Sequence, residues 1–428
     1  MLHHPGSYRP GKTILDEGAT RISHGVGSRG GTLIASALEG DGSLLDGISR
    51  TEARIVADGC RGYDPYDALA SPLFRLPVLR SSKPVRLAAQ QTLKRLPLNV
   101  RPLLGIPKGY NPVTLALVLE GYAYLGRALP EEADRYREAS AALVEELRRL
   151  ASPGYSGACW GYDFDWQTRF DHFPAFTPTI VATCLVTNAL VQAHEEFAVE
   201  GGLALAESAG EFLVHDLHRI PGPADSFCWS YSPLDRQPVL NATAKGARLC
   251  AQLAALAGRT ELLETAHGSL QFVISHQLPT GAWPYAVDDP RSWSDNFHTG
   301  YVLDSLHEYR ARTHDSTFED AENRGWRYYR DNFFDDGRVP RYFDARRYPV
   351  DATAAAQSLL TLCRFGDVET AERVARWSLD HLQRPDGAFA FQVHRRYTNR
   401  IPYMRWSTAW MFCGLARLIL ARSTATAE

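Results

Sequence analysis

Apolar residues recur with helical spacing along this chain, and each run is preceded by a polar residue or a proline. Six such starts stand about fifty to sixty residues apart, an interval typical of repeat proteins. They lie at Asn111-Pro112, Thr177-Pro178, Asn241, Asp295-Asn296, Asp351 and Ser407. Asn, Asp, Ser and Thr side chains accept hydrogen bonds from the free N–H groups of a first helical turn, and proline also fits there. The pattern predicts six helices of one kind.

A second helical pattern follows most of these helices. The ranges are 131–150, 202–217, 261–276, 318–334 and 368–382. Between hairpins come turns in which glycine or cysteine stands close to an aromatic residue, as in Gly281-Ala282-Trp283. The sixth helix, 406–421, lacks a C-terminal partner, and residues 84–96 are expected to supply one from the N-terminal side.

Six hairpins closed into a ring form an all-α (α/α)6 toroid, which we predict for residues 61–428, with the inner helices lining a central cavity. An open helical solenoid is the alternative. Residues 1–60 are rich in Gly and Ser and are expected to form an irregular N-terminal arm.

Composition narrows the class of protein. A chain of 428 residues with 45% hydrophobic residues and a net charge of −3 is that of an ordinary globular protein, without the basic excess of a nucleic-acid binder. Its seven cysteines form no CxxC pair and are odd in number, which favours buried thiols in a reducing compartment. No stretch resembles a signal peptide or a membrane helix. We therefore expect a cytoplasmic protein with no membrane span and no nucleic-acid partner.

Loops that enter the inner helices of a hairpin ring meet at one rim, and here they interleave aromatic, acidic and basic residues. Trp and Tyr faces pack on the C–H faces of sugars, whereas Asp, Asn and Arg bind hydroxyl groups. Inner-helix N-termini and arginines at the same rim favour an anionic sugar. The alternative for each aromatic side chain is packing between hairpins. The candidate substrate-binding residues are Trp160, Arg169, Trp229, Tyr231, Trp283, Asn296, Tyr301, Tyr348, Asp351, Arg400, Arg405 and Trp406.

Four residues are candidate catalysts. Asp165 stands between aromatic residues, where burial would raise its pKa and Arg169 would hold its side chain in place. The alternative is that Asp165 and Arg169 form only an ion pair within the loop. Asp295 precedes His298, which shares a helix face with Tyr301. His298 can exchange a proton near neutral pH, or it serves only as a hydrogen-bonded cap. Tyr397, near Arg400, is a candidate phenolate base. Asp351 is expected to cap its helix, without excluding a catalytic role.

No cofactor is expected. The chain contains no HExxH, EF-hand, spaced Cys/His set, P-loop or dinucleotide-binding GxGxxG. The segment Gly62-Tyr-Asp-Pro-Tyr-Asp67 is either the edge of a lid over the rim or a structural brace.

Two motifs resemble known toroids. The turns Gln277-Leu-Pro-Thr-Gly-Ala-Trp283 and Gln383-Arg-Pro-Asp-Gly-Ala-Phe389 are similar to the QxxxGxW repeat of squalene cyclases and prenyltransferases. The cyclases require a DxDD acid motif, and Asp163-Phe-Asp165-Trp166 lacks its last acid. The prenyltransferases of this fold need a zinc site, which the sequence does not offer.

Four segments resemble an uncharacterised family of toroid proteins associated with bacterial exopolysaccharide and surface-glycan synthesis. They are residues 62–67, 160–169 and 296–301, and Tyr348-Pro-Val-Asp351 with Gln357. The resemblance implies a glycan context rather than a particular reaction. The architecture also resembles six-hairpin glycosidases, N-acylglucosamine 2-epimerases and the helical domain of glucuronyl C5-epimerases, by analogy of fold alone.

The sequence therefore predicts a glycan-modifying enzyme that acts on a sugar or uronate unit of a surface polysaccharide, or on an activated precursor. Hydrolysis would use a carboxylate pair, Asp165 and Asp295. Epimerisation or elimination would use His298, or Tyr397 with Arg400. A non-catalytic glycan-binding protein of a synthase complex and a terpenoid-active toroid are the alternatives, and the oligomeric state stays open.

Overall fold

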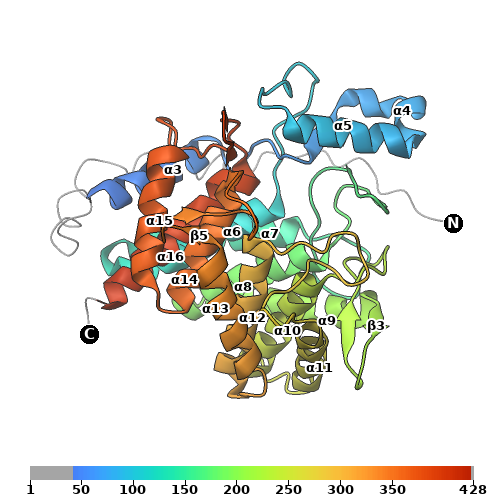
Figure 1. The fold of residues 1–428 in the computed structure, drawn as a ribbon, viewed down its shortest axis with the longest axis vertical. Helices are drawn as coiled ribbons and strands as arrows, with labels where there is room; N and C mark the ends of the chain where they lie inside the picture. Colours follow the sequence, from blue (N-terminus) through green and yellow to red (C-terminus); the bar gives the residue numbers. More distant parts are fainter. Residues whose placement is uncertain (1–41, 426–428) are drawn as a thin grey trace.

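A computed structural model describes residues 42–425, and these fold into a ring of helical hairpins (Figure 1). Successive inner helices pack against one another, and the last packs against the first, which closes the ring. The six inner helices are α6 (Pro112–Ala128), α8 (Ile180–Phe197), α10 (Leu240–Leu256), α12 (Asn296–Thr313), α14 (Ala352–Arg364) and α16 (Trp410–Ala425). The predicted (α/α)6 toroid is therefore confirmed, and an open solenoid is excluded.

The outer helices cover this ring. They are α7 (Ala133–Arg149), α9 (Gly202–Asp216), α11 (Leu262–Ser275), α13 (Glu319–Asn332), α15 (Val368–His381) and α3 (Gly42–Ala57). In α7 the buried residues Tyr136, Ser140, Leu143, Val144 and Leu147 lie on one stripe, as expected of a helix that packs on one side only. In α6, by contrast, almost every residue is buried, because it packs on both sides.

The sixth hairpin differs from the prediction. Residues 84–95 of the predicted range belong to α5 (Lys83–Arg95), which packs against η1 (Asp67–Ala70) and β1 (Trp166–Gln167) rather than against α16. The outer partner of α16 is instead α3, which contacts both α15 and α16. Residues 42–57 are thus a helix of the ring and not an irregular arm, and the remainder of the predicted arm, residues 1–41, lies outside the described residues.

Three of the six predicted helix starts are capped as expected. Asn111, Asp295 and Asp351 each accept a hydrogen bond from a backbone N–H of the following turn. In α8 the cap is Thr179 rather than Thr177, and Asn241 lies inside α10, which begins one residue earlier. A π-helix over Met404–Ala409 precedes α16, so Ser407 is not its cap.

Short strands and turns join the hairpins. The remaining elements are η2 (Pro72–Arg75), α4 (Pro77–Ser81), η3 (Pro130–Glu132), β2 (His172–Phe173), β3 (Arg219–Pro221), β4 (Phe227–Trp229), β5 (Phe334–Asp335), β6 (Val339–Pro340), β7 (Val350–Asp351), β8 (Gln392–Val393) and β9 (Thr398–Asn399). All pairings among these strands are antiparallel. Helices α4 and α5 lie side by side at the top of Figure 1, outside the ring.

Candidate functional site

A cavity of about 630 Å³ opens at the rim where the inner helices begin. Its wall is aromatic, formed by Tyr66, Tyr162, Trp166, Phe173, Tyr231, Tyr285, Trp293, Phe297, Tyr301, Tyr342, Trp406 and Trp410. Its basic residues are Lys94, Arg95, Arg169, Arg291, Arg405 and His298. Among the described residues that line it, none is Asp or Glu. This lining suits a ligand that has both apolar faces and negative charge.

Asp295 and His298 form a dyad at the start of α12. One carboxylate oxygen of Asp295 accepts a hydrogen bond from the backbone N–H of His298 at 2.9 Å. The other lies 2.6 Å from Nδ1 of the His298 ring. A carboxylate accepts hydrogen bonds, so this contact fits the His298 tautomer with its proton on Nδ1, and in that tautomer Nε2 keeps its lone pair. Within residues 42–425, Nε2 has no hydrogen-bond partner, and the ring lines the cavity.

Aromatic rings fix the His298 imidazole from several sides. The ring centroids of Phe297 and Tyr285 lie 4.1 Å and 4.7 Å away. Tyr301, one turn further along α12, lies at 5.9 Å and also lines the cavity. Burial raises the pKa of Tyr301 well above its ordinary value, so its hydroxyl stays protonated and can serve as a donor near neutral pH.

Arg405 is held under the cavity by the segment 62–67. Its Nε donates to Asp64 at 2.6 Å, and its guanidinium lies over the rings of Tyr162 and Trp406. Burial disfavours its charge, but Asp64 and Tyr162 keep the pKa of Arg405 above its ordinary value. A second buried pair, Asp67 with Arg101 at 2.7 Å, fixes the same segment. Segment 62–67 is thus a brace, and its Tyr66 is also part of the cavity wall.

Five of the candidate substrate-binding residues line the cavity: Arg169, Tyr231, Tyr301, Arg405 and Trp406. Arg169 is exposed at the entrance, whereas Arg405 is only 4% exposed. The structure thus brings together residues from two separate rim loops, the π-helix Met404–Ala409 and helix α12.

Three tryptophans do not line the cavity. Trp160, Trp229 and Trp283 are at most 3% exposed and pack in the core between hairpins. The indole N–H groups of Trp160 and Trp283 donate to the backbone carbonyls of Leu147 and Val273. The prediction that these three tryptophans bind the sugar is therefore wrong. They fill the space between inner and outer helices instead.

Asn296 and Asp351 are also buried beneath the rim. Asn296 accepts a hydrogen bond from the Tyr329 hydroxyl at 2.9 Å, and neither residue lines the cavity. Asp351 caps α14 and accepts from the Gln392 amide at 2.8 Å, which is the expected capping role. Burial raises the pKa of Asp351 to about 6. Tyr348 precedes Pro349 through a cis peptide bond and lies outside the cavity lining.

Asp165 lies outside the cavity lining as well. It accepts a hydrogen bond from the backbone N–H of Ala175 at 2.8 Å and pairs with His172 at 3.5 Å, not with Arg169. Burial acts to raise its pKa, but these hydrogen bonds prevail and lower the pKa of Asp165. The expected rise is therefore wrong, because both partners favour the charged form.

Tyr397 and Arg400 are exposed and do not line the cavity. The Tyr397 ring is 47% exposed and stacks on His394, with the centroids 4.4 Å apart. The backbone carbonyl of Arg400 accepts a hydrogen bond from Arg384. The structure does not bring Tyr397 and Arg400 to the site of His298.

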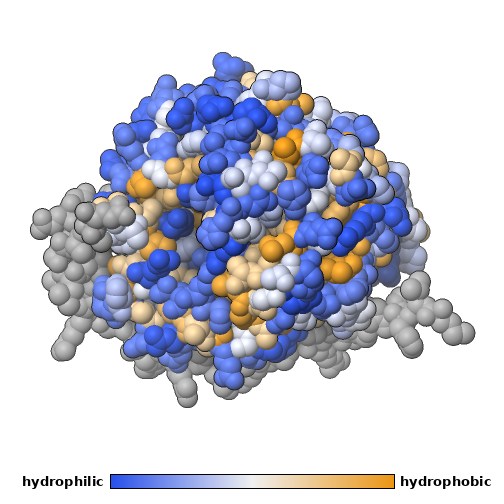
Figure 2. Space-filling model, turned by 90° about the horizontal axis from the view of Figure 1, so that it is seen from below, coloured by the Kyte–Doolittle hydropathy of each residue, from blue (hydrophilic) through white to orange (hydrophobic). Residues whose placement is uncertain are grey.

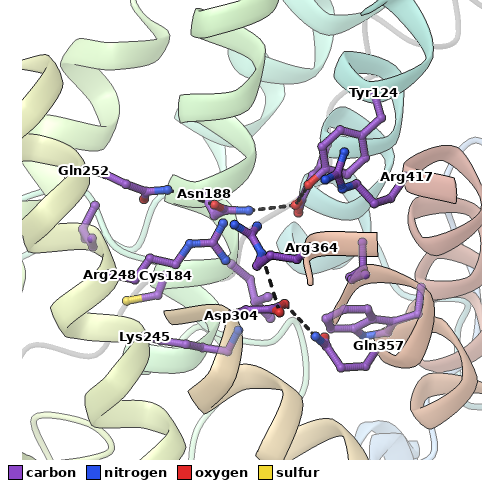
Figure 3. A pocket seen from close by; sticks show the side chains of 15 residues that line it. Tyr124, Cys184, Asn188, Lys245, Arg248, Gln252, Asp304, Gln357, Arg364 and Arg417 are labelled. Carbon is purple, nitrogen blue, oxygen red and sulfur yellow. Dashed lines mark hydrogen bonds and ion pairs between the residues drawn. The ribbon is translucent and has the colours of Figure 1, made fainter. Parts of the chain in front are cut away.

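A smaller cavity of about 20 Å³ lies on the ring interior, where Leu185 and Trp410 also belong to the wall of the larger one (Figure 3). It is polar and charged. Lys245 and Arg248 enter it from α10, Asp304 from α12, and Arg364 from α14. Burial and the neighbouring Arg248 lower the pKa of Lys245 to about 7. Its Nζ lies 3.6 Å from the centroid of the Tyr301 ring, directly behind the larger cavity.

Several cavity residues were not predicted from the sequence. Gln90, Gln91, Lys94 and Arg95 come from α5, which had been assigned to the outer ring. Arg291 and Trp293 come from the loop before Asp295, and their nearness in sequence to that cap is a signal that could have identified them.

Within residues 42–425, no group of three or more His, Cys, Asp or Glu side chains is placed to hold a metal ion. In the same range, no helix has both the length and the apolar character that crossing a bilayer requires. The seven cysteines are all buried and unpaired.

Comparison with known proteins identifies similar folds. Neither a protein-family model nor a curated protein matches the sequence. Among solved structures, a glycoside hydrolase family 76 α-mannanase of Bacteroides thetaiotaomicron matches with a TM-score of 0.57 and 12% identity, covering 74% of this chain and 88% of its own. A cellobiose 2-epimerase of Bacillus thermoamylovorans matches with a TM-score of 0.58 and 10% identity, covering 73% and 88%.

A polysaccharide lyase matches with a TM-score of 0.50 and 12% identity, covering 73% of this chain and 90% of its own. At these identities the likeness establishes the toroid fold.

Proposed function

We propose that this protein is a carbohydrate-active enzyme that moves a proton at a ring carbon of an anionic sugar, in an epimerisation or an elimination. The observation that carries the proposal is the Asp295–His298 dyad, which opens into a basic, aromatic cavity. The toroids with similar folds include an epimerase and a lyase, which supports carbohydrate chemistry. A surface polysaccharide or its activated precursor is the proposed source of the sugar.

A uronate fits this cavity chemically. Its carboxylate acidifies the hydrogen on the adjacent ring carbon, C5, and would be bound by cations of the wall. Lys94, Arg95 and Arg169 line the cavity and form no ion pair with a carboxylate within residues 42–425. His298 Nε2 would accept the C5 proton while Asp295 stabilises the imidazolium that forms. The sugar faces would pack on rings such as Trp166 and Trp406.

From the carbanion the two reactions diverge. In an elimination, the C5–H electron pair forms the C4–C5 double bond, and the group on C4 leaves with a proton. In an epimerisation, a proton returns to C5 from the opposite face. Tyr301, kept protonated by burial, is a hydroxyl donor of α12 that lines the cavity beside His298.

Two-carboxylate hydrolysis is less well supported by this cavity. Asp165 lies outside the described lining, and the Asp295 carboxylate is engaged by His298 on both oxygens. A glycan-binding protein without catalysis would use the same wall, so the experiment must detect chemistry.

Purified protein would be incubated in deuterated water with uronate-containing and neutral oligosaccharides, and the products read by NMR and mass spectrometry. We expect deuterium at C5 or an unsaturated uronate product with the wild type and with Asp165→Asn, and neither with His298→Gln. New reducing ends that are lost with Asp165→Asn would establish hydrolysis instead. Line broadening of a ligand without any product would establish a binding protein.

A further inference from the structure

A basic and apolar surface lies on the segment between the brace and the first ring helix. We call residues 72–104, which include η2, α4 and α5, the platform. From residue 68 to residue 119 the chain contains eight Lys or Arg and no Asp or Glu. They are Arg75, Arg80, Lys83, Arg86, Lys94, Arg95, Arg101 and Lys108. This contrasts with a chain whose overall net charge is −3.

The platform also exposes large apolar side chains. Among the described residues, six of the eleven exposed large hydrophobic side chains belong to it: Leu73, Leu76, Val78, Val85, Leu98 and Leu103. Val78 is 79% exposed and Leu103 is 87% exposed. The far end of the molecule, seen in Figure 2, differs: hydrophilic residues cover most of it and the hydrophobic ones stand in small groups.

The platform is an ordered element, not a loose loop. Its ends meet where Ser71 Oγ donates to the Leu104 carbonyl at 2.7 Å, which brings the turn after α5 next to η2. Ala68, Leu93 and Ile106 form a small core beneath it. Gln90 and Gln167 exchange hydrogen bonds at 3.0 Å and 2.9 Å, which fixes α5 to the rim.

Two of its cations point outward. Within residues 42–425, Arg75 and Arg80 are exposed and form no ion pair with a carboxylate, and Arg80 acts electrostatically on the acidic side chain of Asp165 at the rim. Exposed apolar side chains interleaved with unpaired cations are the combination by which interfacial helices bind a bilayer that contains anionic lipids. A polyanion without apolar groups would satisfy the charges but would leave Val78 and Leu103 exposed to water.

We propose that the platform docks the protein on the surface of a membrane that contains anionic lipids. The apolar side chains enter the headgroup boundary, and the arginines bind lipid phosphates. Because Lys94 and Arg95 of α5, which is part of the platform, line the larger cavity, docking places the cavity entrance close to the lipid surface. The docking itself does not depend on the proposed reaction.

Vesicle co-sedimentation of the full chain tests the proposal, with phosphatidylcholine vesicles that either contain or lack phosphatidylglycerol. We expect binding to the anionic vesicles only, weakened by salt. Arg75→Gln/Arg80→Gln should weaken binding at least tenfold, since each cation near a charged bilayer contributes about fivefold. Val78→Ser/Leu103→Ser should weaken it without a change of charge.

Matched controls exist elsewhere on the surface. Arg395→Gln/Arg396→Gln and Leu234→Ser/Leu278→Ser make the same changes at exposed residues outside the platform and should leave binding unchanged. Circular dichroism checks folding, and turnover of a soluble substrate should be the same in both platform variants. Absence of vesicle binding, equal binding to neutral vesicles, or equal losses in the controls would overturn the proposal. A platform variant that loses self-association, in a protein that does not bind vesicles, would also overturn it. The platform would then be the interface with a second copy of this chain.

Discussion

The carboxylate of Asp295 binds both the backbone and the ring of His298, three residues further along α12. One oxygen accepts the backbone N–H at 2.9 Å and the other accepts Nδ1–H at 2.6 Å. A single side chain therefore starts an inner helix and sets the tautomer of the imidazole that faces the cavity. The position of the proposed base is tied in this way to the fold itself.

Replacing Asp295 by Asn should separate these two roles. Asn caps helices as well as Asp does, so the free energy of unfolding should change by about 1 kcal/mol or less. The amide cannot stabilise an imidazolium, so we expect deuterium exchange into the sugar to fall by roughly 10²- to 10⁴-fold. Exchange rates followed by NMR, beside thermal melts, measure both effects.

Asp351 provides the matched control for that change. It caps the next inner helix, α14, but does not line the cavity. Asp351→Asn should therefore leave the exchange rate within about a factor of three, in line with an ordinary change remote from the reacting atoms. An equal loss in both variants would mean that exchange depends on helix capping, not on the dyad.

Arg169 should affect the selectivity for anionic ligands. It is exposed at the cavity entrance, and no carboxylate pairs with it within residues 42–425. We expect Arg169→Gln to weaken the binding of a uronate oligosaccharide by about 1 kcal/mol, roughly fivefold in Kd. The binding of a neutral oligosaccharide should hardly change. Calorimetric titration at low and high salt would measure this. The same loss for both ligands would contradict an electrostatic role.

Trp160 and Trp406 should behave in opposite ways. Trp160 is fully buried between hairpins, so Trp160→Ala should cost about 3–5 kcal/mol of stability. Folded Trp160→Ala protein should keep the ligand affinity of the wild type. Trp406 lines the cavity, so Trp406→Ala should weaken ligand binding. It should lower the free energy of unfolding less than Trp160→Ala does. Denaturant unfolding and ligand titration distinguish the two, and a binding defect specific to Trp160→Ala would restore it to the site.

The ring could be predicted from the sequence because its signals are local. Caps such as Asn111 and Asp295, followed by helical apolar spacing, determine where inner helices start, and the structure has them there. The partner of α16 could not be predicted in this way. Helices α3 and α5 both precede the first inner helix, α6, in the sequence, and which of them packs on α16 depends on tertiary contacts that no local pattern records.

The site was only partly predictable for a related reason. Asp295, His298 and Tyr301 follow one another at intervals of three residues along the start of α12, so their proximity follows from spacing alone. Whether a rim tryptophan faces a sugar or the core depends on the direction of its side chain within an irregular loop. Trp160 and Trp406 both precede an inner helix in the sequence, yet one is buried in the core and the other lines the cavity.

Lys245 should make the stability of the protein depend on pH. It is 7% exposed, and burial with Arg248 lowers its pKa from 10.5 to about 7. Asp304, Glu120 and Cys184 act in the opposite direction but do not restore it. Between about pH 7 and 10.5 the unfolded chain therefore binds one more proton at this residue than the folded chain does. Its contribution to stability should rise with pH through that window, by up to about 1.4 kcal/mol per pH unit.

Lys245→Met removes this dependence while filling a similar volume. Below pH 7 the variant should be more stable than the wild type, because the folded protein no longer has to bury an ammonium group over the Tyr301 ring, at the wall of the interior cavity. The advantage should shrink as the pH rises toward 10. Urea unfolding of both proteins at several pH values gives the difference curve, from which other titrating groups cancel. Lys83→Met, at an exposed position, controls for the loss of one positive charge and should give a flat curve. If the Lys245→Met curve is equally flat, Lys245 is charged in the folded protein throughout this range, and the interior cavity solvates it.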